Sequence, residues 1–501
     1  MDYSRLRNGN DVRGIASEGV PGEEVNLTKT AARDIARGFC LWLQKRLRKS
    51  RVLVAVGHDS RISAAELLSG AGQGITESGN DLLITGLSST PSMFMLLQDA
   101  AFFGGENNVP DGAIMLTASH LPFNRNGLKF FTKESGLEAD EVKEVLALAG
   151  DPYEAVPETA RGNTKTESYM DKYAADLVKK VRDACNEETP LKDKKIIVDA
   201  GGGAGGFYAE KVLVPLGADV AGSQYLTPDG YFKGHIPNPE NEAAMQSICA
   251  AVKRVKADFG VIFDTDVDRM SAVLSDGEAV NRNALIAMMA AILAPDYPGS
   301  TIVTDSVTSD ELTTFLQDHL HLVHHRYMRG YKNVIDECIR LNQKGIVSPL
   351  AIETSGHGAL SENYYLDDGA YLAVKLIIAA ARARAQGSSL GSLIKELGEP
   401  AESKEYRLKI SGEKAGDYGK QVLETVEKRA AAAGIGIASP SYEGVRLLFP
   451  NGWALLRMSL HDPNMPLNVE SRDVGGCRMI ANQIRPLLAG FDRLDLRVLD
   501  D

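Results

Sequence analysis

The sequence predicts an α/β protein with three successive mixed-sheet α/β domains and a smaller C-terminal α+β domain. The chain has 501 residues, more than one hydrophobic core of ordinary size accommodates. Short runs rich in Val and Ile alternate with longer helical patterns through most of the chain, the rhythm of layered α/β domains. From about Glu402 this rhythm changes to strands and one long Ala-rich helix, which indicates a different final domain.

We expect the first domain to span residues 1–158 and to contain at least three strands separated by helices. Each of these strands leads into a polar or glycine-bearing loop, where α/β sheets usually place their ligands. The expected strands are Arg51–Val56, Asp81–Thr85 and Gly112–Leu116, and the expected helices are Ser63–Ser78 and Pro91–Ala101.

The remaining domains are expected at residues 159–277, 278–400 and 401–501, with joints near Pro157–Thr166 and Asp276–Arg282. In each, the apolar runs point to strands that end next to distinctive loops. The expected strands are Lys195–Val198, Phe259–Phe263, Leu350–Ile352, Val445–Phe449 and Trp453–Ser459, and the Ala-rich helix is Glu413–Ala433.

The composition argues against a general nucleic-acid binder and against a membrane-spanning protein. The formal charge is −12 and the pI about 5.4, so the chain lacks the excess of Lys and Arg that a general nucleic-acid binder uses. No apolar run reaches the ~18 residues that a membrane span needs. Five widely spaced cysteines without a CxxC pair indicate a reducing compartment. We expect a cytoplasmic protein, or one in an organelle stroma if a transit peptide has been removed.

An acidic loop follows the expected strand Phe259–Phe263. Its sequence, Asp264-Thr-Asp-Val-Asp-Arg269, places three carboxylates within five residues. Such crowding is costly without a cation, and three oxygen ligands that leave room for phosphate and water suit Mg²⁺. A solvated acidic turn is the alternative. An EF-hand does not fit, because Arg269 and Leu274 occupy the positions of its Gly and Glu.

A second chemical loop follows the expected strand Gly112–Leu116 and runs from Thr117 to Lys129. Ser119 lies where a nucleophile or phosphoryl carrier would be exposed, with His120 beside it and Lys129 available as a base or phosphate contact. A Ser-His-Asp hydrolase is the competing chemistry, but no GxSxG elbow surrounds this serine.

Together these loops resemble those of the α-D-phosphohexomutase superfamily, which includes phosphoglucomutases, phosphomannomutases and phosphoglucosamine mutases. The likeness rests on TASH…NGLK and DTDVDR and extends along nearly the whole chain. Further matching segments, in order, are Asp11-Val-Arg-Gly14, Gly57-His-Asp-Ser-Arg61, Asp199 to Gly205, His235-Ile-Pro-Asn-Pro239, Glu353-Thr-Ser-Gly-His357 and Gly444-Val-Arg446.

The resemblance implies a heart-shaped enzyme in which one loop from each of four domains meets in a central cleft. It implies that Ser119 is phosphorylated in the active form. One Mg²⁺ per chain would be held by Asp264, Asp266, Asp268 and a phosphoserine oxygen. Arg269 would help to neutralise the phosphoserine, and His120 and Lys129 would assist proton movement.

The reaction that the resemblance implies interconverts hexose 1-phosphate and hexose 6-phosphate, for glucose or mannose, through a hexose 1,6-bisphosphate that also serves as activator. Glu353 and Ser355 match the sugar-binding pair, and His357 and Lys332 are expected on the same side. We also expect substrate contacts from Arg13, Arg61, Arg457 and Ser459. The only partner that we expect is the phosphosugar substrate. We expect the enzyme itself to be a monomer or a homodimer.

The fourth loop departs from the family pattern RxSGTEP. This chain reads Arg457-Met-Ser-Leu-His-Asp-Pro463, so Leu460 and His461 replace the glycine and threonine. Leu121 likewise stands where an asparagine is common. Two alternatives follow: a mutase for a glucosamine-type phosphate, or a binding or regulatory homologue that no longer turns over.

The glycine-rich stretch Asp199 to Gly206 superficially resembles a nucleotide-binding loop. No Lys-Ser or Lys-Thr follows it, and its glycines fit the GxGxxG spacing poorly. We interpret it as a tight turn.

Overall fold

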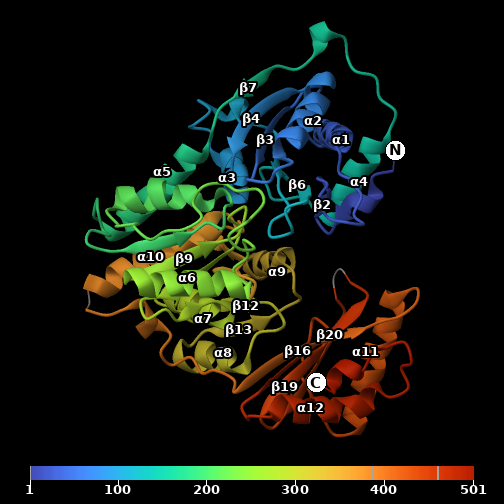
Figure 1. The fold of residues 1–501 in the computed structure, drawn as a ribbon, viewed down its shortest axis with the longest axis vertical. Helices are drawn as coiled ribbons and strands as arrows, with labels where there is room; N and C mark the ends of the chain where they lie inside the picture. The colour runs from blue at the N-terminus through green and yellow to red at the C-terminus, as the bar shows by residue number, and fades with distance from the viewer. Residues whose placement is uncertain (1, 386, 460–461, 501) are drawn as a thin grey trace. The chain divides into compact units, whose positions relative to one another are not determined.

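The structure is a computed structural model that describes residues 2–385, 387–459 and 462–500. Contacts divide the chain into two compact units, each described here by itself (Figure 1). The first unit comprises residues 1–281, 355–359 and 366–390, and the second comprises residues 282–354, 360–365 and 391–501.

The first unit begins with a seven-stranded mixed sheet in the order β1-β2-β6-β5-β3-β4-β7. Strands β3, β4, β5 and β7 run parallel, whereas β6 is antiparallel to both β5 and β2. The β7 strand follows residue 158 in the chain and still pairs with β4. The bounds are β1 Arg7–Asn8, β2 Asp11–Ile15, β3 Leu53–His58, β4 Asp81–Leu87, β5 Gly112–Leu116, β6 Arg125–Phe131 and β7 Thr164–Thr166.

Helices α1, α2 and α4 pack together beside this sheet (Figure 1). Glycine permits the close approach of α1 and α2: a Cβ on Gly74 would lie 1.9 Å from the carbonyl oxygen of Arg33. Helix α3 is shorter than the expected Pro91–Ala101, because a 3₁₀ turn and loop replace its second half. The bounds are α1 Lys29–Leu47, α2 Ala64–Glu77, α3 Thr90–Met95 and α4 Ala139–Gly150.

A second, four-stranded mixed sheet completes the first unit, in the order β11-β10-β9-β8. The parallel pair β8 and β9 has a buried, purely apolar centre, and β9 leads straight into the acidic loop. The bounds are β8 Ile196–Asp199, β9 Phe259–Phe263, β10 Met270–Leu274 and β11 Ala279–Val280, with helices α5 Met170–Cys185, α6 Glu242–Val255 and α10 Gly369–Ala385.

The second unit contains a parallel arrangement in which β12 lies between β13 and β14. Strand β15, Gly358–Leu360, follows where the chain passes from one unit to the other. The bounds are β12 Thr301–Thr304, β13 Val323–Arg326 and β14 Leu350–Ile352, with helices α7 Arg282–Leu293, α8 Asp310–Thr314 and α9 Tyr331–Gln343.

The C-terminal part of the second unit is an antiparallel sheet in the order β16-β20-β19-β18-β17. Its apolar face shares a core with α11 and α12, so the predicted three α/β domains and smaller α+β domain are confirmed. The bounds are β16 Glu402–Lys409, β17 Gly436–Ile437, β18 Val445–Phe449, β19 Gly452–Leu456 and β20 Asn464–Ser471, with α11 Ala415–Ala432 and α12 Gly476–Ile484. Among the described residues, none of the helices has the length and apolarity to span a membrane.

Candidate active site

Two loops of the first unit meet around Ser119. The loop after β5 carries the serine, and the loop after β9 carries the aspartates. The Ser119 hydroxyl donates to Asp264 Oδ2 at 2.9 Å, and its Oγ accepts a hydrogen bond from Arg269 Nη2 at 2.8 Å. The side chains that the sequence predicted for catalysis and metal binding are therefore in direct contact.

Both loops contain a residue in the left-handed region of backbone conformation. Ser119 has φ of 50° and Val267 has φ of 68°, although neither is glycine. This conformation is uncommon for serine and costly for a β-branched valine, and strained backbone of this kind is concentrated at functional sites. The strain indicates that the surrounding structure fixes the path of both loops.

Arg61 positions the backbone of the serine loop through hydrogen bonds. Its side chain is fully buried, and its guanidinium donates to the carbonyl oxygens of Ser119, Leu121, Pro122 and Arg125. Asp59 balances its charge, with Oδ2 3.3 Å from Arg61 Nε. Arg61 thus positions the loop backbone, and its expected contact with substrate stays a prediction.

Arg13 supports the same loop from strand β2. Its Nη1 donates to the carbonyl oxygen of Ala118 at 2.9 Å, and Nη2 donates to Asp11 Oδ2 at 3.0 Å. The side chain remains 17% exposed, unlike that of Arg61, so it can also reach a ligand.

The three aspartates form a compact cluster: Asp264, Asp266 and Asp268 are buried and each presents an oxygen within 4.8 Å of the others. Lys129 Nζ donates to Asp266 Oδ2 at 2.9 Å and to Asp268 Oδ2 at 2.5 Å. The Oδ1 atoms of Asp266 and Asp268 are buried without a hydrogen-bond partner among the described residues.

This donor set fits a hard divalent cation. Buried carboxylate oxygens normally have partners, and the two Oδ1 atoms without one are the kind of ligand that such a cation takes. The acidic triad could therefore hold a metal ion.

Neighbouring backbone shapes the acidic loop. The glycine-rich turn packs directly against it, because a Cβ on Gly203 would lie 2.5 Å from the carbonyl oxygen of Thr265. From the other side, the first residue of α3, Thr90, donates its backbone N–H to the Asp266 carbonyl oxygen at 2.8 Å and its hydroxyl to that carboxylate. The glycines are needed for close approach, in agreement with a tight turn.

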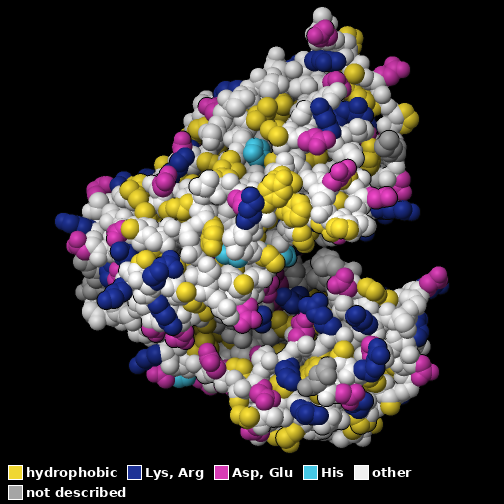
Figure 2. Space-filling model, in the orientation of Figure 1, with side chains coloured by type: hydrophobic (Ala, Val, Ile, Leu, Met, Phe, Trp, Pro, Cys, Tyr) yellow, Lys and Arg dark blue, Asp and Glu magenta, His cyan; other side chains and the backbone are white. Residues whose placement is uncertain are grey.

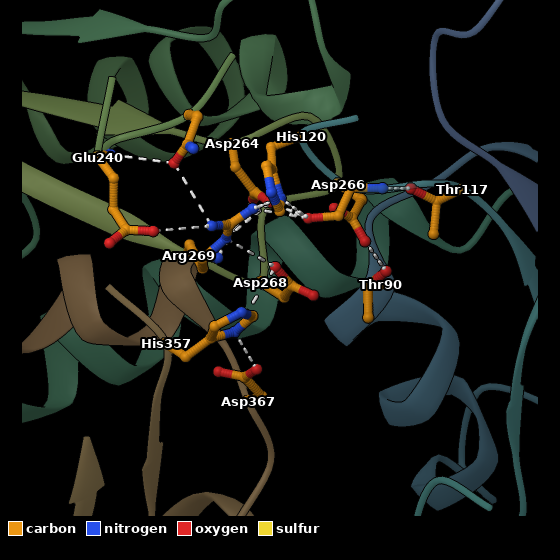
Figure 3. Close-up of polar contacts among 12 residues, drawn as sticks. Thr90, Thr117, His120, Glu240, Asp264, Asp266, Asp268, Arg269, His357 and Asp367 are labelled. Carbon is orange, nitrogen blue, oxygen red and sulfur yellow. Dashed lines mark hydrogen bonds and ion pairs between the residues drawn. The ribbon is translucent and has the colours of Figure 1, made fainter. Parts of the chain in front are cut away.

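Arg269 links the aspartates to the serine loop, as Figure 3 shows. Besides Ser119 it contacts Asp264 through Nε at 3.3 Å and Asn238 through Nη1 at 3.4 Å, and its Nη1 lies 3.9 Å from Glu240. The charge of Arg269, followed by burial, lowers the pKa of the adjacent His120 to about 2. His120 is therefore a neutral imidazole in this arrangement.

His357 has the opposite electrostatic environment (Figure 3). Its Nδ1 contacts Asp367 and lies 3.9 Å from Asp268 Oδ1. Burial by itself would lower the pKa of His357, but Asp367 and Asp268 raise it to about 9. The site thus contains one neutral histidine, His120, whose Nδ1 faces Arg269, and one cationic histidine, His357, which lies between two carboxylates.

The carboxylates also differ from one another. Burial and the charges of Asp268 and Asp266 raise the pKa of Asp264 well above its usual value. Burial acts in the same direction on Asp268, but Lys129, His357 and Arg269 hold the pKa of that carboxyl below its usual range. Such separation is typical of functional sites.

The predicted sugar-binding residues lie around the ends of β14. Glu353 is buried, and its Oε1 accepts the backbone N–H of Gly330 at 2.7 Å. Lys332 forms an ion pair with Asp336 one helical turn away in α9. Ser355 is buried and belongs to the first unit, together with His357. Substrate binding by these residues stays a prediction.

The fourth loop is described in part. Arg457 follows β19 with its side chain 6% exposed, and its Nη1 lies 3.7 Å from Glu443 Oε1. The Ser459 hydroxyl oxygen accepts the backbone N–H of Asp462 at 3.2 Å. Leu460 and His461, the replacements that the sequence singled out, lie outside the described residues.

Several supporting residues escaped the sequence reasoning. Asp59, Thr90, Asn238, Glu240 and Asp367 contact predicted site residues but have no chemical signature of their own. Asp59 lies within the segment Gly57 to Arg61, and Asn238 lies within His235 to Pro239. Their position inside these segments was the available signal, whereas Thr90 and Asp367 lay outside every motif.

Comparison with known proteins gives matches over most of the chain. Residues 4–149 match the family description phosphoglucomutase/phosphomannomutase, alpha/beta/alpha domain I; residues 167–277 match its domain II, and residues 281–400 its domain III. The matched ranges contain Ser119, the aspartate triad and Glu353.

Curated relatives and solved structures agree with this match. The chain is 26% identical over 484 residues to a phosphoglucomutase of Neisseria meningitidis, with 95% of each chain covered. It is 28% identical over 467 residues to a phosphoglucomutase/phosphomannomutase of Thermococcus kodakarensis, covering 92% of this chain and 93% of the relative. A phosphoglucomutase/phosphomannomutase family protein of Burkholderia thailandensis shares the fold, with a TM-score of 0.79, 24% identity and 98% of each chain covered.

The full-length matches agree with the residues that meet at the serine loop. The chain belongs to the phosphoglucomutase/phosphomannomutase family of the α-D-phosphohexomutase superfamily and is an enzyme of the isomerase class.

Proposed function

We propose that this enzyme is a phosphohexomutase that interconverts the 1-phosphate and 6-phosphate of glucose or mannose. Ser119 carries the phosphoryl group, and a hexose 1,6-bisphosphate is the intermediate and activator. The observation that best supports this proposal is the contact of Ser119 Oγ with both Asp264 and Arg269, at 2.9 and 2.8 Å. A serine so placed has a counter-charge for its phosphorylated form and a donor for its oxygen.

In the proposed transfer, the bond between phosphorus and Ser119 Oγ breaks while a bond between phosphorus and a sugar hydroxyl oxygen forms. Arg269 donates to Oγ and stabilises the negative charge that develops there. We assign Lys129 as the base that accepts the hydroxyl proton, and His120, whose Nδ1 lies 3.3 Å from Ser119 Oγ, as a residue that assists proton movement. In the second half of the cycle the other phosphate returns to Ser119.

We assign Asp264, Asp266 and Asp268 as ligands of one Mg²⁺, for which their buried oxygens are suited. When bound, this ion supplies positive charge that neutralises the transferring phosphoryl group. Arg61 and Arg13 fix the backbone on either side of Ser119, so the serine stays in position while the charge changes.

We assign recognition of the sugar to residues around β14. We assign recognition of the distal phosphate to the fourth loop. Glu353 and Ser355 would hold the vicinal O3 and O4 hydroxyls of the sugar. The same two residues could hold these hydroxyls in either orientation of the bisphosphate. Arg457 and Ser459 would bind the phosphate that does not react. Lys332 lies one helical turn from its partner Asp336 and would contribute charge at the sugar side.

The test is a coupled assay of glucose 1-phosphate conversion to glucose 6-phosphate with Mg²⁺ and a trace of glucose 1,6-bisphosphate. We expect Ser119→Ala to abolish turnover and the mass of one phosphoryl group to be missing from that variant. Ser135→Ala, on the turn after β6, is the matched control and should remain active.

Mannose 1-phosphate and glucosamine 1-phosphate in the same assay rank the substrates. Turnover on glucosamine 1-phosphate alone would replace the proposed substrate class with the amino-sugar alternative. No turnover on any hexose phosphate would contradict the mutase and favour a binding role.

A further inference from the structure

The guanidinium of Arg269 has a different partner on each of its nitrogens. Nη2 donates to Ser119 Oγ at 2.8 Å, and Nε donates to Asp264 Oδ2 at 3.3 Å. The third nitrogen, Nη1, donates to Asn238 Oδ1 at 3.4 Å and lies 3.9 Å from Glu240 Oε2 (Figure 3). Because the group is planar and rigid, the partners of Nη1 also influence the direction in which Nη2 points.

The two partners of Nη1 belong to a short irregular segment, residues 235–240, that leads into helix α6. The side-chain oxygen of Asn238 accepts the backbone N–H of Glu240 at 3.0 Å. The backbone N–H of Asn238 donates to the Ile236 carbonyl oxygen at 2.8 Å, and prolines on either side restrict the chain further. The position of the Asn238 oxygen therefore depends on the path of the whole segment.

His235 fixes the beginning of this segment. Its Nε2 lies 3.0 Å from Asp199 Oδ2 and 3.1 Å from Oδ1, and its Nδ1 lies 3.0 Å from the Ile236 carbonyl oxygen. Both nitrogens face acceptors, and an imidazole that donates from both nitrogens is protonated. Histidine occupies little of the surface drawn in Figure 2, and the His235 side chain is 4% exposed. His235 and Asp199 therefore form a buried ion pair.

Asp199 is itself held through both of its oxygens. It ends strand β8 and is fully buried; Oδ1 accepts the backbone N–H of Gly201 at 2.9 Å, and Oδ2 accepts from Gln224 at 2.6 Å. Burial by itself would lower the pKa of His235, but Asp199 raises it above its usual value. Strand β8 pairs with β9, which leads into the loop of Arg269, so both ends of the segment depend on one sheet of the first unit.

The glycine-rich turn after β8 supports the same segment. Gly201 has φ of 55°, and a Cβ on it would lie 2.6 Å from Pro237 Cβ and 3.5 Å from His235 Cε1. A side chain at this position would push the segment away. The turn and the segment, two sequence motifs without a role in the proposed reaction, thus pack together next to Arg269.

We propose that His235, paired with Asp199, is a positioning residue of this enzyme. It holds the segment that presents Asn238 to Arg269, and so keeps Nη2 of that arginine directed at Ser119 Oγ. The inference rests on the proposed function, because Arg269 is the donor assigned to the negative charge that develops on Oγ. His235 acts without contact to the substrate or the reacting atoms.

The first test is steady-state kinetics of the full-length enzyme with glucose 1-phosphate, Mg²⁺ and glucose 1,6-bisphosphate. His235→Phe removes both donors but keeps a ring beside that of Tyr225, 4.9 Å away. We expect kcat to fall about 10- to 100-fold and KM to stay within about threefold, because a misdirected Arg269 fails mainly in the transition state. His235→Gln keeps one donor for Asp199 and should have a smaller effect.

A double-mutant cycle separates positioning from general stabilisation. The background variant, Asn238→Ala with Glu240→Gln, removes the amide oxygen and the carboxylate that the segment presents to Arg269. If His235 acts through these groups, His235→Phe should lower kcat by less than about threefold in this background. Equal factors in the parent and in the background would overturn the proposal.

His325→Phe is the matched control. His325 Nε2 lies 2.8 Å from Glu337 Oε1, so it too is paired with a buried carboxylate, but in the second unit. A merely structural loss would lower the unfolding temperature of both variants. Positioning predicts the large fall in kcat for His235→Phe alone, with kcat of His325→Phe within about threefold of the parent.

A second measurement needs no turnover. Hydrogen exchange followed by mass spectrometry reports on the backbone N–H groups of Asn238, Glu240 and Asn241, which all donate within this part of the chain. We expect exchange to be about 10-fold faster in His235→Phe than in the parent, and unchanged in His325→Phe.

The outcomes separate this inference from the proposed function. If the parent turns over no hexose phosphate, the mutase is contradicted, and exchange decides the inference: faster exchange in His235→Phe retains it, and an unchanged rate overturns it. Turnover with kcat of His235→Phe within about threefold of the parent, or a loss confined to KM, overturns the positioning role alone. If His235→Phe does not fold, as judged by thermal unfolding, the His235→Gln result decides.

Discussion

The two units hold their functional groups in different ways. Around Ser119 the contacts are short and buried: Lys129 reaches two aspartates at 2.9 and 2.5 Å, and Arg269 reaches the serine at 2.8 Å. In the second unit, Arg457 Nη1 lies 3.7 Å from Glu443 Oε1. The groups proposed for chemistry are organised by short contacts before substrate arrives, whereas the ion pair of Arg457, a residue proposed for recognition, is longer.

This difference matches what the proposed reaction demands. Phosphoryl transfer needs charges fixed in advance around one oxygen, because reorganisation during the reaction would raise the barrier. Recognition must accept a bisphosphate in two orientations, so its contacts cannot be tight for only one of them. The comparison predicts that substitutions in the first unit lower kcat and that those in the second raise KM.

The largest effect is expected from the acidic triad. Asp266→Asn should lower kcat about 100- to 1,000-fold and raise the Mg²⁺ concentration needed for activity, because a charged ligand of the proposed ion is lost. Chelation of the parent enzyme should abolish activity, and added Mg²⁺ should restore it. Asp276→Asn, in the turn after β10, is the control. An unchanged Mg²⁺ titration in Asp266→Asn would contradict the metal assignment.

A second large effect concerns the support of the serine loop. Arg61→Met leaves the buried carboxylate of Asp59 without its counter-charge and the loop carbonyls without donors, so the free energy of unfolding should fall by about 3 to 5 kcal/mol. Denaturant unfolding measures this loss. Arg161→Met, which removes an exposed arginine 3.5 Å from Glu77, should cost less than about 0.5 kcal/mol. Equal stabilities of the two variants would show that Arg61 does not hold the loop.

A moderate effect is expected at the proposed sugar contact. Glu353→Gln keeps an oxygen for the N–H of Gly330 but removes the charge that a sugar hydroxyl would meet. KM for glucose 1-phosphate should rise about 10-fold with a smaller change in kcat. Steady-state kinetics beside the exposed control Glu362→Gln provide the test. A loss confined to kcat would place Glu353 with the chemistry and remove the contrast between the two units.

A further prediction is a pH dependence of stability within the second unit. Burial raises the pKa of Glu470 to about 7, although the hydrogen bond from Trp453 and the charge of Arg446 oppose it. The folded form therefore binds more protons than the unfolded chain between about pH 4.5 and 7, so the contribution of Glu470 to stability falls as pH rises through this range.

Glu470→Gln should remove this loss of stability with rising pH, because an amide does not titrate in this range. The amide also keeps an oxygen for the Trp453 N–H. Relative to the parent, the variant should gain roughly 1 to 3 kcal/mol between pH 5 and pH 8 in thermal or denaturant unfolding. The exposed Glu427→Gln on α11 should show no such trend. A parent-to-variant difference that is independent of pH would contradict the assignment.

Part of this site could be predicted from short sequence patterns. The strands Gly112–Leu116, Phe259–Phe263, Leu350–Ile352 and Val445–Phe449 have the predicted bounds, because continuous apolar runs between polar loops have few other structures available. The triad and Ser119 were identifiable because crowded carboxylates and a serine loop at strand ends have a chemical meaning that does not depend on distant residues. The length of α3 was overestimated, since local turns compete with the helix there.

What only the tertiary structure decided is which distant residues meet. Nothing in its local sequence distinguishes Arg61, which holds four carbonyl oxygens, from an arginine that binds phosphate. Glu443 meets the Arg457 guanidinium, and Asp367 contacts His357, only after strands and loops come together. The sequence by itself determined the reactive groups, because their chemistry is local. The fold decided their partners, charges and backbone strain, because these depend on burial and on contacts between segments far apart in the chain.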